Sequence, residues 1–258
     1  MTKALRWINV FFFLGMVIIN MLANTIPLGG KNTGEISSGY PTLFTPAPYT
    51  FSIWGLIYIL TAVYVLFQTG IIRSNTEVPE MGARIGIFFT ISCILNILWI
   101  LTWHYDYIGC SVITIILLLI DLIIINSRIK SIDAGSITGL LSSYGFQIYM
   151  GWLAAATIAN ISVFLVKINW SRFGMSETVW TIIILIIGAL IGAAFVMKSG
   201  YLFSTMAVIW AYVGILIKHV GINGYDGEYR SIIATLVICL AIMVIAIILG
   251  ALMQMRND

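Results

Sequence analysis

Long hydrophobic stretches separated by short polar connections run along the whole chain, and the five prolines lie between them. Each stretch is close to the roughly 20 residues that a helix needs to cross a bilayer. Their Ile and Leu runs lack the alternating pattern of a membrane β-strand. The pattern predicts an all-α fold, a polytopic membrane helix bundle of about eight transmembrane helices. The expected spans are residues 5–25, 51–72, 84–103, 108–127, 145–166, 178–197, 200–217 and 231–253.

The longest connection is the first, residues 26–50 (IPLGGKNTGEISSGYPTLFTPAPYT), which is rich in proline, glycine and aromatic residues but poor in charge. A disordered linker is usually more polar and less aromatic. Long ordered loops are often functional. We therefore expect residues 26–50 to form an ordered cap over the ends of the helices.

The composition excludes a soluble protein. Of the 258 residues, 60% are hydrophobic and 9% are charged, and the mean hydropathy is +1.04. Soluble domains carry roughly 25% charged residues. Eight spans of about 20 residues use roughly 160 positions, and the remainder serves termini and connections, which leaves no room for a separate soluble domain. Its net charge of +3 comes from residues spread singly along the chain, which indicates neither a nucleic-acid partner nor an acidic docking tail.

Lysine and arginine residues are divided unevenly between alternate connections. Eight of the 13 fall on the side that holds both termini, and five fall on the other side. Because cytoplasmic loops carry the excess of positive charge, this division predicts that both termini are cytoplasmic. We expect an integral protein of the cell (plasma) membrane.

Sequence motifs of catalysis are missing. The chain contains no HExxH, no GxSxG, no Walker loop and no GxGxxG with an acidic partner. Cys93, Cys110 and Cys239 lie in or beside hydrophobic stretches, without the spacing of metal ligands. We expect no enzyme, no metal site and no cofactor.

Several aromatic and amide side chains inside the spans share helix faces. Residues three, four, seven or eleven apart lie on one face of an α-helix. Buried indole and amide groups need hydrogen-bond partners, so such faces suit the wall of a small-molecule cavity. On periodicity alone, plain helix packing with asparagine joining the helices is the simpler interpretation. The faces are Trp54 and Tyr58; Asn96, Trp99 and Trp103; and Tyr149, Trp152, Ala156 and Asn160.

Three motifs resemble the TspO/translocator family, also called tryptophan-rich sensory proteins. The segment from Tyr40 to Tyr58, YPTLFTPAPYTFSIWGLIY, is similar to the family pattern W-Y-x-x-L-x-K-P-x-W-x-P-P-x-W-V-F-G-x-x-W-x-x-L-Y. The stretch NILW that ends at Trp99 resembles the N-x-x-W/F of the family's third helix. The segment from Tyr149 to Asn160 resembles the fifth-helix pattern Y-x-x-W-x-x-x-A-x-x-x-N. The chain departs from the family at Thr45, where the pattern has Lys, and at Tyr49, where it has Trp.

This resemblance implies a five-helix bundle with a cavity near the first loop, which in the family binds porphyrins, sterols and aromatic drug-like molecules. It covers about residues 1–170 and leaves residues 171–258 as three additional transmembrane helices. The matching positions that would line the cavity are Tyr40, Trp54, Asn96, Trp99, Trp152 and Ala156. Phe51, Tyr58, Tyr149 and Asn160 belong to the same motifs and complete the expected ligand site.

Asp121 lies inside the fourth span, in LLLIDLIIIN. A charge at that depth costs about 2.5–3.5 kcal/mol on insertion scales, which makes the residue a candidate for function. It could couple a proton or hold a cationic ligand. The simpler interpretation is a protonated side chain that is hydrogen-bonded to a neighbouring helix, for instance through Asn126 or a serine.

Two glycines, Gly188 and Gly192, form a GxxxG motif, which favours close helix packing and can serve as the face of a homodimer. The leading functional prediction is a protein, surrounded by membrane lipid, that binds a hydrophobic, porphyrin-like (tetrapyrrole) ligand in an aromatic cavity and transports or senses it. The alternative is a proton-coupled secondary transporter that uses Asp121. A purely structural membrane subunit would bind no ligand.

Overall fold

Nine α-helices and three short 3₁₀ helices make up the described part of the chain, which in this computed structural model comprises residues 1–26, 28–70, 77–130 and 137–255. Eight helical segments are long and apolar enough to cross a membrane, so the expected all-α fold and its eight spans are confirmed. The elements are α1 (Lys3–Thr25), η1 (Leu28–Gly30), α2 (Thr33–Ser38), η2 (Pro48–Ser52), α3 (Ile53–Gln68), α4 (Glu77–His104), α5 (Ile108–Ile129), α6 (Ile137–Lys167), η3 (Arg172–Gly174), α7 (Glu177–Ser199), α8 (Leu202–Val220) and α9 (Arg230–Met255).

Two helices begin earlier than their hydrophobic pattern indicates. α4 starts at Glu77 and α6 at Ile137, whereas the expected spans start at residues 84 and 145. Their first residues, EVPEMGA in α4 and ITGLLSSY in α6, mix apolar residues with glycine and polar side chains, so a hydropathy pattern misses them. Pro79 consequently lies in the first turn of α4, not between helices, and it is tolerated there because an N–H in that turn has no intrahelical partner.

Short polar motifs set several helix ends. The Thr2 hydroxyl accepts from the Leu5 N–H at 3.3 Å and starts α1, and the Ser176 hydroxyl accepts from the Val179 N–H at 3.3 Å and starts α7. α7 ends at Gly200, whose φ of 70° is the left-handed conformation that glycine adopts without steric cost. These caps satisfy backbone groups that the helices leave open.

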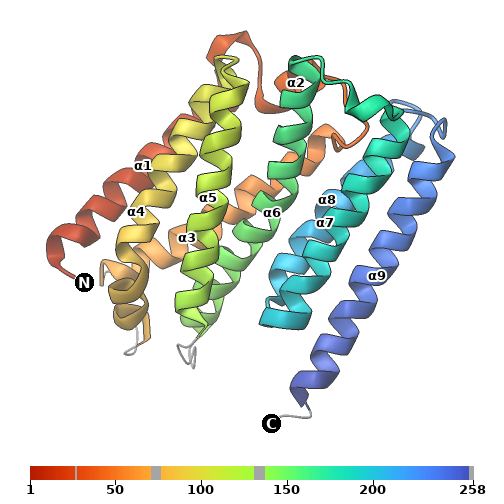
Figure 1. Ribbon diagram of the computed structural model, residues 1–258. Coiled ribbons are helices and arrows are strands. Elements are labelled where there is room, and N and C mark those ends of the chain that lie inside the picture. Colours follow the sequence, from red (N-terminus) through yellow and green to blue (C-terminus); the bar gives the residue numbers. More distant parts are fainter. Residues whose placement is uncertain (27, 71–76, 131–136, 256–258) are drawn as a thin grey trace.

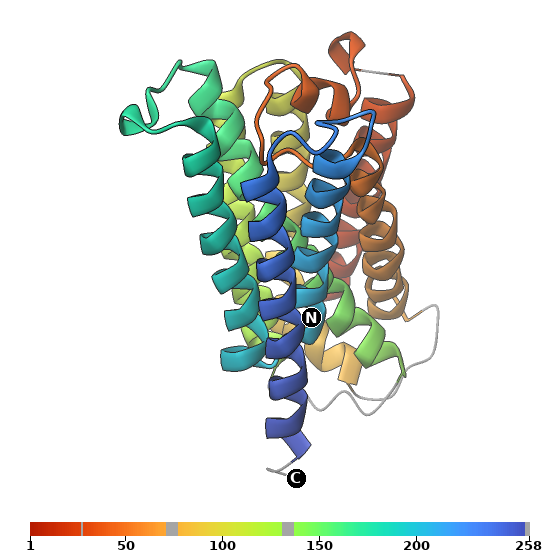
Figure 2. The same cartoon turned by 90° about the vertical axis from the view of Figure 1, so that its right-hand side faces the viewer.

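The helices form two groups, and the main contact between the groups is that of α6 with α8. α1, α3, α4, α5 and α6 pack as one bundle, and α7, α8 and α9 pack as a second group beside it (Figure 1). α6 packs on α3 and α5 within the first group and on α8 of the second. The first connection lies across the upper end of the bundle, close to the α8–α9 connection in both views (Figures 1 and 2).

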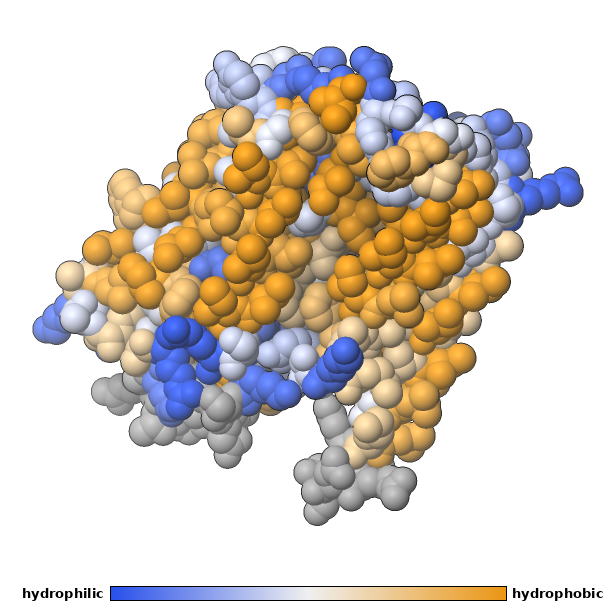
Figure 3. Space-filling model, viewed as in Figure 1, coloured by the Kyte–Doolittle hydropathy of each residue, from blue (hydrophilic) through white to orange (hydrophobic). Residues whose placement is uncertain are grey.

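On the face that Figure 3 shows, hydrophobic side chains cover the middle of the molecule and hydrophilic ones gather toward its two ends. This distribution fits a chain surrounded by lipid. Inside the bundle, Asn9 on α1 donates from Nδ2 to Gln68 Oε1 at 2.8 Å and accepts a hydrogen bond from the Thr90 hydroxyl. Such contacts between polar side chains hold α1 against α3 and α4.

The GxxxG glycines of α7 pack inside the chain. A Cβ at Gly188 would lie 2.5 Å from the Tyr212 hydroxyl, and one at Gly192 would lie 2.9 Å from Met243 Sδ. The two glycines therefore let α8 and α9 approach α7 closely. A homodimer stays a prediction, and it would need a surface other than these glycines.

Candidate functional site

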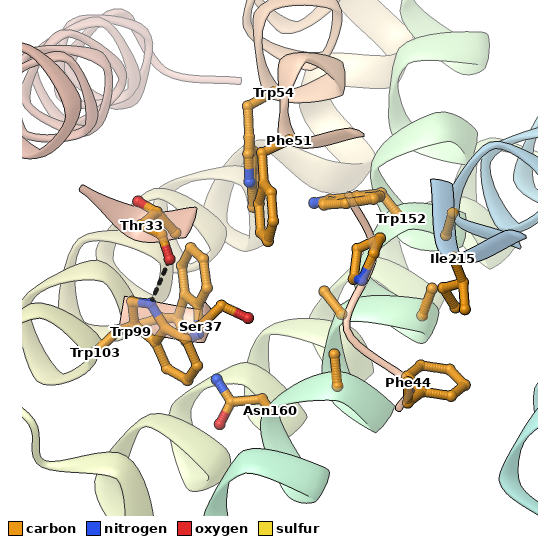
Figure 4. A pocket seen from close by; sticks show the side chains of 15 residues that line it. Thr33, Ser37, Phe44, Phe51, Trp54, Trp99, Trp103, Trp152, Asn160 and Ile215 are labelled. Carbon is orange, nitrogen blue, oxygen red and sulfur yellow. Dashed lines mark hydrogen bonds between the residues drawn. The ribbon is translucent and has the colours of Figure 1, made fainter. Parts of the chain in front are cut away.

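A small aromatic cavity lies beneath residues 28–52, which we call the lid (Figure 4). Its volume is about 40 Å³. A water needs roughly 10–15 Å³ of such space, so the cavity has room for a few waters and is too small for a flat aromatic ligand in this conformation. Among the described residues, no charged side chain lines it. Its walls are Thr33, Ser37, Phe44, Pro46 and Phe51 of the lid; Trp54 of α3; Trp99 and Trp103 of α4; Trp152, Ala155, Ala156, Ala159 and Asn160 of α6; and Ala211 and Ile215 of α8.

Four indole rings form one connected cluster around this cavity. Trp99 stacks between Trp54 and Trp103, with ring centroids 5.6 and 6.4 Å away. The Trp152 ring stands edge-on to Trp54 at 6.3 Å and to Phe51 at 5.8 Å. Offset and edge-to-face pairs of this kind contribute about 0.5–1.5 kcal/mol each beyond their buried area, so the wall is a rigid aromatic surface.

Two of these indoles carry an N–H that has no acceptor among the described residues. Trp103 donates from Nε1 to the Thr33 carbonyl at 3.3 Å (Figure 4). By contrast, the Nε1 of Trp99 and that of Trp152 have no partner within the described part of the chain, although the two side chains are only 4% and 2% exposed. A buried donor without a partner costs about 1–3 kcal/mol, so each is a ready donor for a bound molecule.

A chain of hydrogen bonds joins α1, α4 and α6 behind the indole cluster. Asn20 of α1 donates from Nδ2 to Asn96 Oδ1 at 2.7 Å, and Asn96 donates in turn to the Tyr149 hydroxyl at 2.7 Å. The Tyr149 ring stands edge-on to Trp54 with centroids 5.6 Å apart, and the Tyr58 ring stacks on Trp54 at 5.7 Å. Trp54 is thus fixed by three helices at once.

The lid is docked on α8 through backbone atoms. The Ala47 N–H donates to the Gly214 carbonyl at 3.1 Å, and the Trp210 Nε1–H donates to the Thr50 carbonyl at 2.9 Å. His219, at the far end of α8, has its Nε2 2.9 Å from the Leu43 carbonyl. Since that carbonyl can only accept, the histidine is the donor.

A second attachment holds the other side of the lid. The Tyr40 hydroxyl donates to Asp106 Oδ1 at 2.5 Å, and Lys167 Nζ lies 2.7 Å from Asp106 Oδ2. The hydrogen bond to Asp106 is the main cause that raises the pKa of Tyr40. Burial disfavours the ionised Asp106, but hydrogen bonds from Lys167 and Tyr40 outweigh it and lower the pKa of this carboxyl. We call Tyr40, Asp106 and Lys167 the latch.

The ten residues expected at a ligand site divide into three layers. Tyr58, Asn96 and Tyr149 lie directly behind the cavity wall and orient it. Tyr40 lies at the outer rim, in the latch. The members that line the cavity itself are Phe51, Trp54, Trp99, Trp152, Ala156 and Asn160.

Several lining residues were not in that set. Ala155 and Ala159 flank Ala156, and the alanine run in LAAATIAN is the signal that could have identified them, because small residues leave space between helices. Phe44 lies in the matched segment without being one of its fixed letters. Ala211 and Ile215 of α8 carry no motif at all, so only the packing of α8 against α6 reveals them.

Asp121 lies outside the cavity, on the face of α5 that is buried in the bundle. Its side chain is 5% exposed, and its Oδ2 has no hydrogen-bond partner in the described ranges. Asn126 does not supply one, since its Nδ2 donates to the carbonyls of Leu122 and Phe146. No group of three or more His, Cys, Asp or Glu side chains that could hold a metal occurs among the described residues.

Comparison with known proteins gives one match. The TSPO-like protein family matches residues 6–249, which extends beyond the motifs of residues 1–170 and includes α7, α8 and most of α9. No curated protein and no solved structure matches the chain. Because the family match spans nearly the whole sequence and all eight membrane helices, this integral membrane protein belongs to the TSPO-like protein family.

Proposed function

We propose that the protein binds a hydrophobic, flat, porphyrin-like ligand in the cavity under the lid and transports or senses it without chemical turnover. The observation that carries this proposal is the aromatic cavity whose described walls are uncharged and hold two indole N–H groups, of Trp99 and Trp152, without an acceptor among the described residues. Flat aromatic rings stack well on indoles, and ring nitrogens or carbonyls would accept from the two donors.

Such a ligand requires the cavity to enlarge. A second hollow of about 330 Å³ lies on the other side of Phe51 and Trp54, and the two hollows share these residues and Thr33. Rotation of the Phe51 ring, or opening of the lid that carries it, would join them. Ligand binding and lid movement are therefore coupled in this proposal.

Titration of the purified protein with protoporphyrin IX and with its dimethyl ester tests the proposal. Because the cavity is lined without charge, the neutral ester should bind more tightly than the dicarboxylate. Quenching of tryptophan fluorescence would follow binding at the indole cluster. Absence of saturable quenching by either compound would contradict the proposal and favour a purely structural subunit.

The proposed setting is the plasma membrane, with both termini in the cytoplasm and the lid on the outer side. The eight-to-five division of basic residues supports this orientation. Fusion of a reporter that is active only in the cytoplasm to the C-terminus tests it. An inactive C-terminal reporter would show that the C-terminus lies outside the cytoplasm and would contradict the proposed orientation.

Proton-coupled transport is the second candidate, supported by the Oδ2 of Asp121, which has no hydrogen-bond partner among the residues that the structure describes. This carboxyl is buried on α5, which packs against α4 and α6, the helices that carry Trp99 and Trp152. In proteoliposomes, a ligand flux driven by a proton gradient should be abolished by Asp121→Asn. A flux that survives the substitution would exclude Asp121 as the coupling site.

A further inference from the structure

A separate cavity, of about 200 Å³, lies between α6 and α7. Phe44 lines both this cavity and the one under the lid, which we call the tryptophan cavity. It is several times larger than the space that one water needs. Its walls change in character from one end to the other. The polar end carries Trp170, Arg172, Glu177 and Trp180. The deeper, mainly apolar part carries Leu165, Val166 and Ile184, beside the hydroxyl side chains of Ser162 and Thr181.

Neither charge of the polar end has an ionic partner in the part of the chain that the structure describes. Arg172 donates only from Nε to the Met175 carbonyl, at 3.4 Å, and forms no ion pair within the described residues. Glu177 accepts from the Leu43 N–H at 3.2 Å and likewise has no ion pair in that part of the chain. One cation and one anion therefore face the same cavity without neutralising each other.

The depth of the cavity fits the edge of a bilayer. The spans on either side end at Lys167 and begin at Glu177, so the polar end lies where the chain leaves the membrane. Trp170 and Trp180 lie at this level, with their ring centroids 4.8 Å apart. Indole side chains favour the headgroup region of a bilayer. The apolar part continues between α6 and α7 at the depth of the acyl chains.

We infer that this cavity binds the head of a zwitterionic phospholipid. The phosphate would lie on the guanidinium of Arg172, which suits phosphate oxygens, and the ammonium would lie against Glu177 and the two indoles. One acyl chain would follow Leu165, Val166 and Ile184 into the bilayer. The inference does not rest on the proposed ligand of the tryptophan cavity.

Native mass spectrometry of the full-length protein, titrated with phosphatidylethanolamine in detergent, tests the inference. One lipid per chain should be retained, and phosphatidylglycerol with the same acyl chains should be retained roughly tenfold less, because its head lacks the ammonium. Arg172→Gln and Glu177→Gln should each reduce retention of phosphatidylethanolamine by a similar factor. Lys198→Gln, at the opposite end of α7, is the matched control and should change nothing.

Two further arms separate the remaining explanations. Val166→Trp fills the apolar part and leaves both charges in place, so it should also abolish retention while the melting temperature stays that of the unaltered protein. Free phosphoethanolamine should compete only at far higher concentration than the lipid. Equal retention of both lipids, retention unaffected by the variants, or equal competition by free phosphoethanolamine would each overturn the assignment.

Discussion

A tryptophan in the middle of a membrane span has two uses that its position in the sequence does not separate. It can fill the space between helices, or it can form the wall of a binding cavity. Trp152 has the features of both, since it packs edge-on against Trp54 and Phe51 and its N–H has no acceptor in the described ranges of the chain. A smaller ring at this position distinguishes the two uses, because it would lower thermal stability in the first case and ligand affinity in the second.

Replacement of Trp152 by phenylalanine removes the donor and part of the stacking area. We expect ligand affinity to fall by about 1–2 kcal/mol and thermal stability to change less, because a cavity wall tolerates a small loss of volume. Fluorescence titration and thermal unfolding of the same preparation measure both. Trp7→Phe is the control, because Trp7 is 64% exposed on α1. Unchanged affinity with a clearly lower melting temperature would remove Trp152 from the site.

Helical spacing identified aromatic residues that share a helix face. It did not identify which of them line the cavity. Trp54, Trp99 and Trp152 converge because each lies on the face of its helix that spacing identifies. Tyr40 belongs to the same motif, yet its hydroxyl is drawn to Asp106 at the rim. That outcome depends on the turn between α4 and α5, which no periodic pattern describes.

At the scale of the element, the lid is the part whose attachment can be tested. Asp106 has a lowered pKa, so the latch stabilises the closed lid above the ordinary pKa of aspartate, about 3.9, and this contribution is lost as the pH falls through the lowered value. Hydrogen-exchange protection of residues 33–39, corrected for intrinsic exchange, should therefore decline below about pH 4. Asp106→Asn should remove this acid dependence. Protection that declines equally in the variant would contradict the role of the latch.

The other attachment depends on a glycine. A Cβ at Gly214 would lie 2.1 Å from the Thr50 hydroxyl oxygen, so Gly214→Ala should displace the lid from α8 and make it sensitive to protease. Gly55→Ala is the matched control, because nothing lies within 4 Å of a Cβ there and alanine favours a helix by about 1 kcal/mol. A lid that resists protease equally in both variants would show that α8 does not hold it.

At the scale of the whole molecule, the division between the five-helix bundle of residues 1–170 and the three helices of residues 171–258 can be tested by truncation. A chain that ends after Ser171 should still insert, because the first core cluster lies almost wholly within the five-helix bundle and takes only Ala207 and Ala211 from α8. We expect it to lose ligand binding, since α8 supplies Ala211 and Ile215 to the cavity and the anchor points of the lid. Membrane insertion and porphyrin titration of the truncated chain measure this. Retained binding would support two separable domains.

The sequence predicted the number of spans well, because each must supply about 20 apolar residues. It could not predict how the last three helices meet the first five. That contact depends on small residues whose importance appears only once packed, such as Gly151, where a Cβ would lie 2.1 Å from the Ser204 carbonyl oxygen. A hydrophobic pattern records that a position is apolar and does not record how near the next helix comes.

The indole cluster also gives the protein an optical signature of its own. Trp54, Trp99 and Trp103 stand in a row with successive centroids 5.6 and 6.4 Å apart, and Trp152 stands nearly perpendicular to the first, at 84°. Transition dipoles this close and this differently oriented couple as excitons. Circular dichroism in the indole absorption bands should consequently show a paired positive and negative feature when the four rings are assembled. The chain would then report the state of its own cavity with no label attached and no ligand present.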